Sequence, residues 1–145
     1  LKVDPRKNMM FNPAESIDFN GNTGPFIQYS YARIKSVMRK AADMDLVPAD
    51  NTDGIELNAK ERSLVNILRA FDTLIISAAD ELNPAIIANY VYELSKEFNQ
   101  FYHDFSILGE ENNMVRMFRL ALTEYTGKVI GKAMWLLGID MPERM

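Results

Sequence analysis

Apolar residues recur at helical spacing in four long stretches of the chain, which are separated by short polar breaks. Each stretch predicts one helix with a buried stripe, because residues three or four positions apart share a helix face. Four such helices packed antiparallel, preceded by a short irregular segment, predict an all-α bundle. The expected stripes are Ile27, Tyr31, Ile34, Met38 and Ala41; then Leu64, Leu68, Phe71, Ile75, Ala78 and Leu82; then Ile87, Val91, Leu94, Phe98, Phe101 and Phe105; and finally Val115, Phe118, Leu122, Tyr125, Val129 and Leu136.

The predicted helices begin at residues that typically start helices, namely capping side chains, prolines and acidic groups. We expect the second helix to kink near 72–73. The start signals are Thr23 and Pro25 for a helix over 25–43, Asn58 with Glu61 for the second helix, Asn83-Pro84 for the third, and Glu110-Glu111 for a fourth over about 110–137.

Two glycines four residues apart, Gly127 and Gly131, lie inside the fourth predicted helix. Each glycine costs a helix about 1 kcal/mol relative to alanine. Their presence predicts that a neighbouring helix approaches closely there, so that the fourth helix is central and touched from two sides. Gly138 is a natural stop for this helix.

Residues 1–24 are short and punctuated by turns, with at most one helical turn over 14–19. They contain no independent core, so we expect them to pack on something outside this chain. The chain therefore divides into 1–24 and a helical domain over 25–145, and we interpret it as a fragment of a longer protein. The polar loop at about 46–57 is expected to be mobile.

Composition narrows the classes of function. The 145 residues are 48% hydrophobic, which is ample for one domain with a packed core. Cysteine is absent, so disulfides and thiolate zinc sites are excluded, and no apolar run is long enough to predict a membrane span. The net charge of −4 argues mildly against nucleic acid, although the distribution of charge matters more than its sum.

One exposed line on the first helix combines rings and cations. A sector about 60° wide, away from the buried stripe, holds Tyr29, Arg33, Ser36 and Lys40. An aromatic ring beside a guanidinium and an ammonium suits an RNA backbone with a base to stack. The spacing alone favours the alternative of a gap-filling tyrosine and solvated cations, because such stripes are common on helix surfaces.

A second line on the third helix lies beside its core stripe and consists of Tyr92, Ser95, Asn99 and Tyr102. Tyrosine and asparagine are typical readers of splayed single-stranded bases. The same residues also suit an interface with another helix.

Patterns for catalysis are weak. His103 is the only histidine, so it has no second histidine or cysteine with which to bind a metal. No acidic pair sits in a convincing apolar setting for acid–base chemistry, and no phosphate-binding or nucleophile motif is present. A small hydrolase is therefore disfavoured.

Several segments, taken in order across the whole chain, closely resemble class I arginyl-tRNA synthetases. Segments similar to the end of the catalytic region of that family are 4–13 (DPRKNMMFNP), 15–19 (ESIDF), 21–29 (GNTGPFIQY) and 32–34 (ARI). Segments similar to its helical anticodon-binding domain, often called the DALR domain, are 88–94 (ANYVYEL), 98–104 (FNQFYHD), 107–109 (ILG), 136–139 (LLGI) and 142–145 (PERM).

The resemblance implies a parent enzyme that joins arginine to its tRNA in the cytoplasm, using ATP with magnesium and passing through an arginyl-adenylate. It implies that this chain binds the anticodon arm of tRNA beside the upstream catalytic domain, with no role for DNA or a membrane. The catalytic signatures of the family lie upstream and are absent here, so we expect no cofactor and no catalysis in this fragment alone.

The resemblance also suggests which residues bind. Aromatic and apolar groups near the third-helix tyrosine and the chain end contact the anticodon loop in the family. Tyr31 stands where many relatives have His, and Arg119 opens only a loose echo of the DALR pattern. The candidate tRNA-binding residues are Tyr29, Arg33, Lys40, Tyr92, Asn99, Tyr102, Arg144 and Met145. The alternative is a helical protein-interaction module, in which the aromatic stripes dock a partner helix or the catalytic domain.

Overall fold

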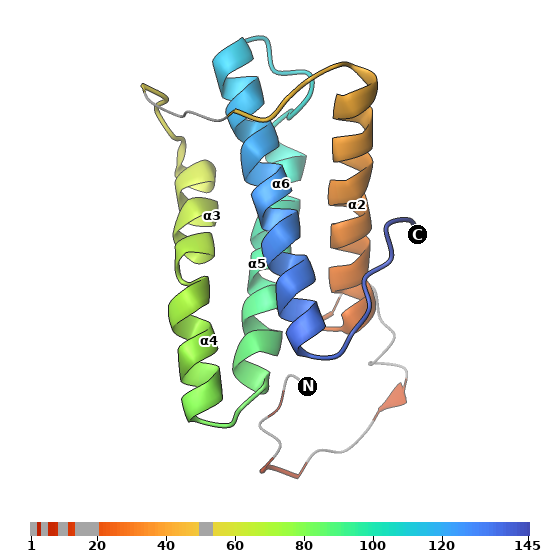
Figure 1. Ribbon diagram of the computed structural model, residues 1–145, viewed down its shortest axis with the longest axis vertical. Coiled ribbons are helices and arrows are strands. Elements are labelled where there is room, and N and C mark those ends of the chain that lie inside the picture. Colours follow the sequence, from red (N-terminus) through yellow and green to blue (C-terminus); the bar gives the residue numbers. More distant parts are fainter. Residues whose placement is uncertain (1–2, 4–5, 9–11, 14–20, 50–53) are drawn as a thin grey trace.

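The computed structural model describes residues 3, 6–8, 12–13, 21–49 and 54–145. The helices between Gly24 and Leu136 form an antiparallel bundle. The helices are α2 (Gly24–Asp43), α3 (Ala59–Arg69), α4 (Phe71–Asp80), α5 (Ala85–Asp104) and α6 (Asn113–Leu136). Figure 1 shows α3 and α4 stacked end to end as one rod, so that four rods alternate in direction. The predicted all-α bundle is confirmed.

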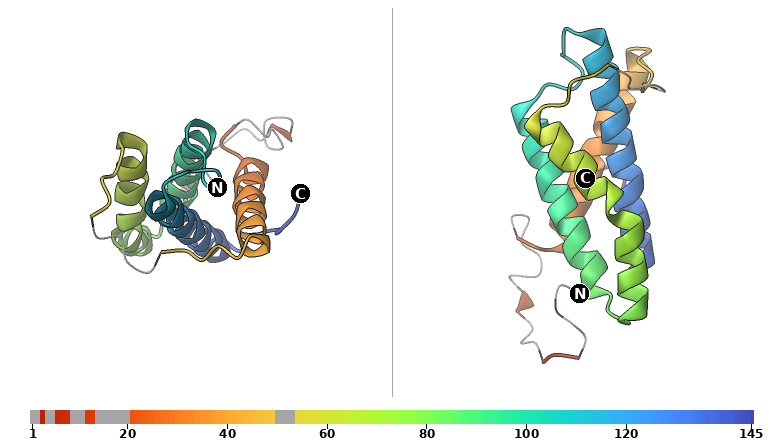
Figure 2. Two further views of the ribbon diagram at one scale, coloured as in Figure 1. Left: turned by 90° about the horizontal axis from the view of Figure 1, so that it is seen from above. Right: turned by 90° about the vertical axis from the view of Figure 1, so that its left-hand side faces the viewer.

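Three helices form the centre of the bundle. Helices α2, α5 and α6 contact one another, and the α3–α4 rod packs mainly on α5, as the end-on view in Figure 2 shows. Residues 46–49, which follow α2, cross over α6, where the amide of Ala49 donates to the carbonyl of Met117 at 3.1 Å. None of the helices in the described residues combines the length and apolar character needed to cross a membrane.

Two of the predicted helix starts have their capping bonds in place. The Thr23 hydroxyl accepts from the amide of Phe26, with Pro25 in the first turn of α2. Asn58 and Glu61 form both bonds of a capping box at the start of α3. These polar side chains satisfy amides that the helix itself leaves without partners.

The second predicted helix is divided rather than kinked near 72–73. It ends at Arg69 and resumes at Phe71, with Ala70 serving as the cap of both parts. The expected core position of Leu82 is wrong, because this residue is 85% exposed and has a φ of 50°. It lies in the left-handed turn that closes α4, which directs the side chain away from the stripe.

The fourth helix begins later than expected, at Asn113, because the Asn112 side chain caps it by accepting from two amides. The expected core position of Tyr125 is also wrong, since this residue is 55% exposed, and Leu136 is exposed as well. Helix α6 is packed from two sides, by α2 and α5, which turns its buried face away from these two residues.

The two glycines of α6 provide the expected close approach. A Cβ on Gly127 would lie 2.8 Å from Cγ2 of Ile34, and one on Gly131 would lie 3.3 Å from Cε2 of Tyr31. Both neighbours belong to α2, so the predicted close approach of a neighbouring helix at these glycines is confirmed.

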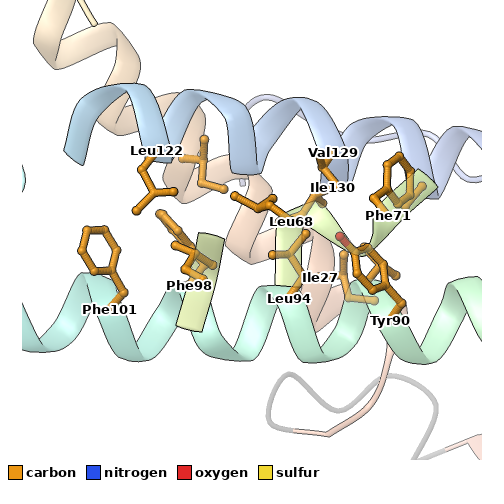
Figure 3. Packing of buried hydrophobic residues seen from close by; sticks show 14 of the residues in the cluster. Ile27, Leu68, Phe71, Tyr90, Leu94, Phe98, Phe101, Leu122, Val129 and Ile130 are labelled. Carbon is orange, nitrogen blue, oxygen red and sulfur yellow. The ribbon is translucent and has the colours of Figure 1, made fainter. Parts of the chain in front are cut away.

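The core follows the third predicted stripe. Leu94, Phe98 and Phe101 on α5 are fully buried and face α6, as Figure 3 shows. The predicted turn over 14–19 lies outside the described residues, as do residues 50–53 of the loop, and the division of the chain at residue 24 stays a prediction.

Candidate nucleic-acid interface

A hollow of about 700 Å³ lies between α2, the C-terminal end of α5 with its following connection, and the last two residues of the chain. We call it the α2–α5 groove. Six of the eight candidate residues line it, so the helical ridges and the chain end converge on one surface as expected. The lining is Tyr29, Ala32, Arg33, Ser36, Val37, Arg39, Lys40, Tyr102, Phe105, Ser106, Ile107, Leu108, Gly109, Arg144 and Met145.

Arg33 stands between two tyrosines at the centre of this surface. Its guanidinium carbon is 4.9 Å from the ring centroid of Tyr29 and 5.0 Å from that of Tyr102. Its Nη1 donates to Oδ1 of Asn99 at 2.6 Å, and Nδ2 of Asn99 donates to the Ser30 hydroxyl at 2.7 Å. The network fixes the guanidinium between the rings, which remain 47% and 39% exposed. Asn99 thus supports the groove from behind without lining it.

The second predicted line is only partly an exposed surface. Tyr92 packs on Phe26 with ring centroids 5.3 Å apart and does not line the groove, while Ser95 is fully buried. Helix α5 turns these two residues toward α2 and the core. At Tyr92 the helix-interface interpretation therefore fits the geometry, and the structure does not bring this residue to the other candidates.

Arg119, which was not among the residues expected at the site, holds the connection that forms one wall of the groove. Its Nε donates to Oε1 of buried Glu61 at 2.7 Å, while Nη1 donates to the carbonyl of Ser106 at 2.9 Å and to Oε2 of Glu110 at 2.6 Å. Its guanidinium also lies over the Phe105 ring at 5.1 Å. Glu110 serves this ion pair through Oε2, while its Oε1 accepts from the amide of Asn112, the cap residue of α6, at 3.1 Å. The signal in the sequence was an arginine inside the apolar run of the fourth helix.

Three further residues missed in the sequence lie along α2 and bind the end of the chain. Nε2 of Gln28 donates to the carbonyl of Asp140 at 3.0 Å, and Nη1 of Arg39 donates to the carbonyl of Glu143 at 3.1 Å. Nζ of Lys35 lies 3.0 Å from Oε1 of Glu143. This hydrogen bond lowers the pKa of the Glu143 carboxyl and raises the pKa of the Lys35 ammonium.

The charge of the groove differs from that of the whole chain. Its described lining contains four cations, which are Arg33, Arg39, Lys40 and Arg144, and no acidic residue. The net charge of −4 is therefore carried elsewhere on the molecule. A surface with exposed rings, cations and an apolar wall is suited to stacking bases and neutralising phosphates.

No catalytic arrangement competes with this interpretation in the part of the chain that the structure describes. His103 is exposed, and its Nδ1 lies 3.0 Å from Oδ1 of the neighbouring Asp104. The described residues also contain no cluster of three or more histidine and acidic side chains that could hold a metal ion.

A protein-family model described as the DALR anticodon binding domain matches residues 27–145. The match covers α3 to α6 and all but the first residues of α2. The chain belongs to the DALR anticodon-binding domain family. This finding confirms the resemblance inferred from the motifs, and the groove of the DALR domain lies wholly within the matched residues.

Relatives of this DALR domain are arginine–tRNA ligases. The chain is 61% identical to the enzyme of Phocaeicola vulgatus and 58% identical to that of Bacteroides thetaiotaomicron, in each case over its whole length. It spans only about a quarter of the length of these relatives, 24% in both cases.

Solved structures agree with these relatives. The arginyl-tRNA synthetase of Thermus thermophilus superimposes with a TM-score of 0.87 at 30% identity, covering 100% of this chain and 25% of the other. The arginyl-tRNA synthetase of Plasmodium falciparum gives a TM-score of 0.80 at 25% identity, covering 99% of this chain and 25% of the other.

Proposed function

We propose that this DALR domain binds the anticodon arm of a tRNA in the α2–α5 groove. The observation that carries the proposal is the gathering of two exposed tyrosine rings around Arg33, beside Lys40 and Arg144, in a lining without acids. Unpaired bases need faces on which to stack, and their phosphates need cations. The family model and the relatives support the same ligand.

The domain is proposed to act within a longer arginine–tRNA ligase, because the chain spans about a quarter of its relatives. That enzyme would attach arginine to its tRNA during translation in the cytoplasm. ATP and magnesium would serve the catalytic region, which is the proposed neighbour of this domain, and neither is assigned to the residues described here. The domain alone is expected to bind tRNA without charging it.

In the proposed complex the anticodon loop opens and its bases leave their stack. Tyr29 and Tyr102 offer ring faces to these bases, and Met145 with the apolar wall at 107–108 packs against them. The edges of the bases are left for hydrogen bonds. Lys40 and Arg144 lie where they can neutralise phosphates of the loop. Arg33, held between the rings, keeps both tyrosines in place.

Replacing Tyr102 by alanine tests this assignment. Stacking contributes about 1–3 kcal/mol per base, so Tyr102→Ala should weaken binding of a labelled anticodon stem-loop about fivefold to 150-fold. Fluorescence anisotropy measures the change. Tyr125→Ala is the matched control, because this tyrosine is also exposed (55%, against 39% for Tyr102) but lies on α6 outside the groove, and its loss should leave the affinity unchanged.

The same titration addresses the alternative of a protein-interaction module. Saturable binding of the stem-loop by the unaltered chain, weakened by Tyr102→Ala and unchanged in Tyr125→Ala, supports the RNA site. The absence of saturable binding to anticodon stem-loops at low salt would favour a groove that docks another protein segment.

A further inference from the structure

The last residues of the chain, 139–145, turn back and run along α2; we call them the tail segment (Figure 1). The reversal follows α6 directly. The amide of Ile139 donates to the carbonyl of Met134 and that of Gly138 to the carbonyl of Trp135, a Schellman ending with Gly138 at a φ of 72°. The exit direction of the tail segment is therefore fixed by the helix end.

One face of α2 binds the tail segment at two levels. Gln28, Lys35 and Arg39 fall within a sector about 40° wide at 100° per residue. Gln28 and Arg39 donate to backbone carbonyls of the tail segment, whereas Lys35 alone contacts a side chain, that of Glu143. The first two contacts follow the path of the backbone, and the third recognises a particular residue.

The contacts of Lys35 and Arg39 with Glu143 set the position of the two residues that enter the groove. Glu143 is fixed through both its carbonyl and its carboxylate, and Arg144 and Met145 follow it directly into the groove lining. Met145 is 60% exposed, so burial in the core does not explain its placement. Arg39 lines the groove itself, which connects the polar contacts to the binding surface.

We propose that Gln28, Lys35 and Arg39 are positioning residues, which hold the tail segment on α2 so that Arg144 and Met145 stand ready in the groove before RNA arrives. The inference rests on the proposed anticodon site. A tail that is already ordered loses less conformational freedom on binding than one that must be recruited, so holding it in advance raises affinity.

A measurement without RNA tests the placement directly. In a sample with ¹³C-labelled methionine methyl groups, the Met145 signal is assigned by its loss in Met145→Leu. Lys35→Glu should release the tail segment, so that this signal sharpens and moves toward its position in an unfolded peptide. The exchanged pair, Lys35→Glu with Glu143→Lys, should return it toward the position in the unaltered chain.

Binding of an anticodon stem-loop tests the consequence. Lys35→Glu should weaken affinity about three- to tenfold, and the exchanged pair should recover most of the loss at an unaltered net charge. Lys96→Glu is the matched control, because it reverses the charge of another partly exposed lysine (49%, against 35% for Lys35) that pairs with Glu93 on α5. In a chain that stops after Glu143, Lys35→Glu should reduce the affinity for the stem-loop no more than Lys96→Glu does.

The outcomes separate the two proposals. If the unaltered chain binds no stem-loop, the proposed anticodon site is wrong. If it binds, but Lys35→Glu matches Lys96→Glu in affinity and leaves the Met145 methyl signal unmoved, the positioning role alone is overturned. Loss of affinity in Lys35→Glu that persists in the shortened chain would also overturn it, because Lys35 would then act without the tail.

Discussion

Arg33 could either bind a phosphate of the RNA or hold the two tyrosine rings beside it. Its charge and exposed helix position suggested a contact with phosphate, yet its guanidinium is stacked between Tyr29 and Tyr102 and bound to Asn99. Arginine suits such a place because its planar group stacks and donates at once. We therefore expect it to act chiefly by holding the rings.

Replacing Arg33 by methionine separates these roles. If it holds the rings, Arg33→Met should weaken stem-loop binding about tenfold while the slope of log affinity against log salt stays unchanged. Lys40→Met is the comparison, because loss of a phosphate contact should flatten that slope by about 0.7. Titrations at several salt concentrations give both values, and a flattened slope for Arg33→Met would assign it to phosphate instead.

Helix α6 determines how the other elements pack, because α2 and α5 both lie against it. Its glycines are the positions where this packing is closest. A methyl group on Gly127 would press on Ile34 inside the core, whereas one on Gly131 meets the edge of the partly buried Tyr31 ring.

The two glycines should therefore respond differently to alanine. Gly127→Ala should lower the free energy of unfolding by about 1–3 kcal/mol, since overpacking outweighs the better helix propensity. Gly131→Ala should change it by less than about 1 kcal/mol, because the propensity gain offsets a smaller clash. Urea denaturation of both variants measures this, and equal effects would contradict the close contact at Ile34.

The ion pair of Arg119 joins α3, α6 and the connection at the groove. Arg119→Met should lower the free energy of unfolding by about 3 kcal/mol or more, because it leaves the buried Glu61 charge without its partner. Glu110→Gln should cost less, since Glu110 is partly exposed. Denaturation of the two variants tests the order, and a loss below 1 kcal/mol for Arg119→Met would show that Glu61 finds another partner.

Periodicity in the sequence predicted the helices because most stripe residues do face a single core. It failed where tertiary packing replaces local pattern: Tyr125 has helical spacing but lies outside the sector enclosed by α2 and α5. The groove residues on α2 could be predicted from their shared face. The roles of Asn99 and Arg119 could not, because a buried polar network depends on partners from distant segments.

At the scale of the whole molecule, an acidic chain presents a basic groove with its own end in it. The placement of that end should depend on pH through Glu143. Its hydrogen bond with Lys35 lowers the pKa of the carboxyl, and the charges of Lys35, Arg39 and Arg144 act in the same direction. The pKa of Lys35 is raised by Glu143 and by Tyr31.

The sign of the pH dependence follows from these directions. A depressed carboxyl pKa gives a stabilising contribution that is present above the ordinary glutamate pKa and is lost as the pH falls through the lowered value. The raised lysine pKa moves the alkaline loss above the ordinary lysine range. The Met145 methyl signal should therefore hold steady near neutrality and change below about pH 4. Glu143→Gln should abolish that acid step, and a step retained in this variant would assign it to another group.

Both segments that close the groove flank α6: the connection at 106–109 precedes it and the tail segment follows it. The length of α6 therefore determines where both segments lie. Removing one residue from it would shorten it by about 1.5 Å and rotate its exit by about 100°. The chain end would then leave along another side of the bundle and would not reach the α2–α5 groove. The number of residues in α6, as much as the contacts of the tail segment, therefore decides what Met145 can contact.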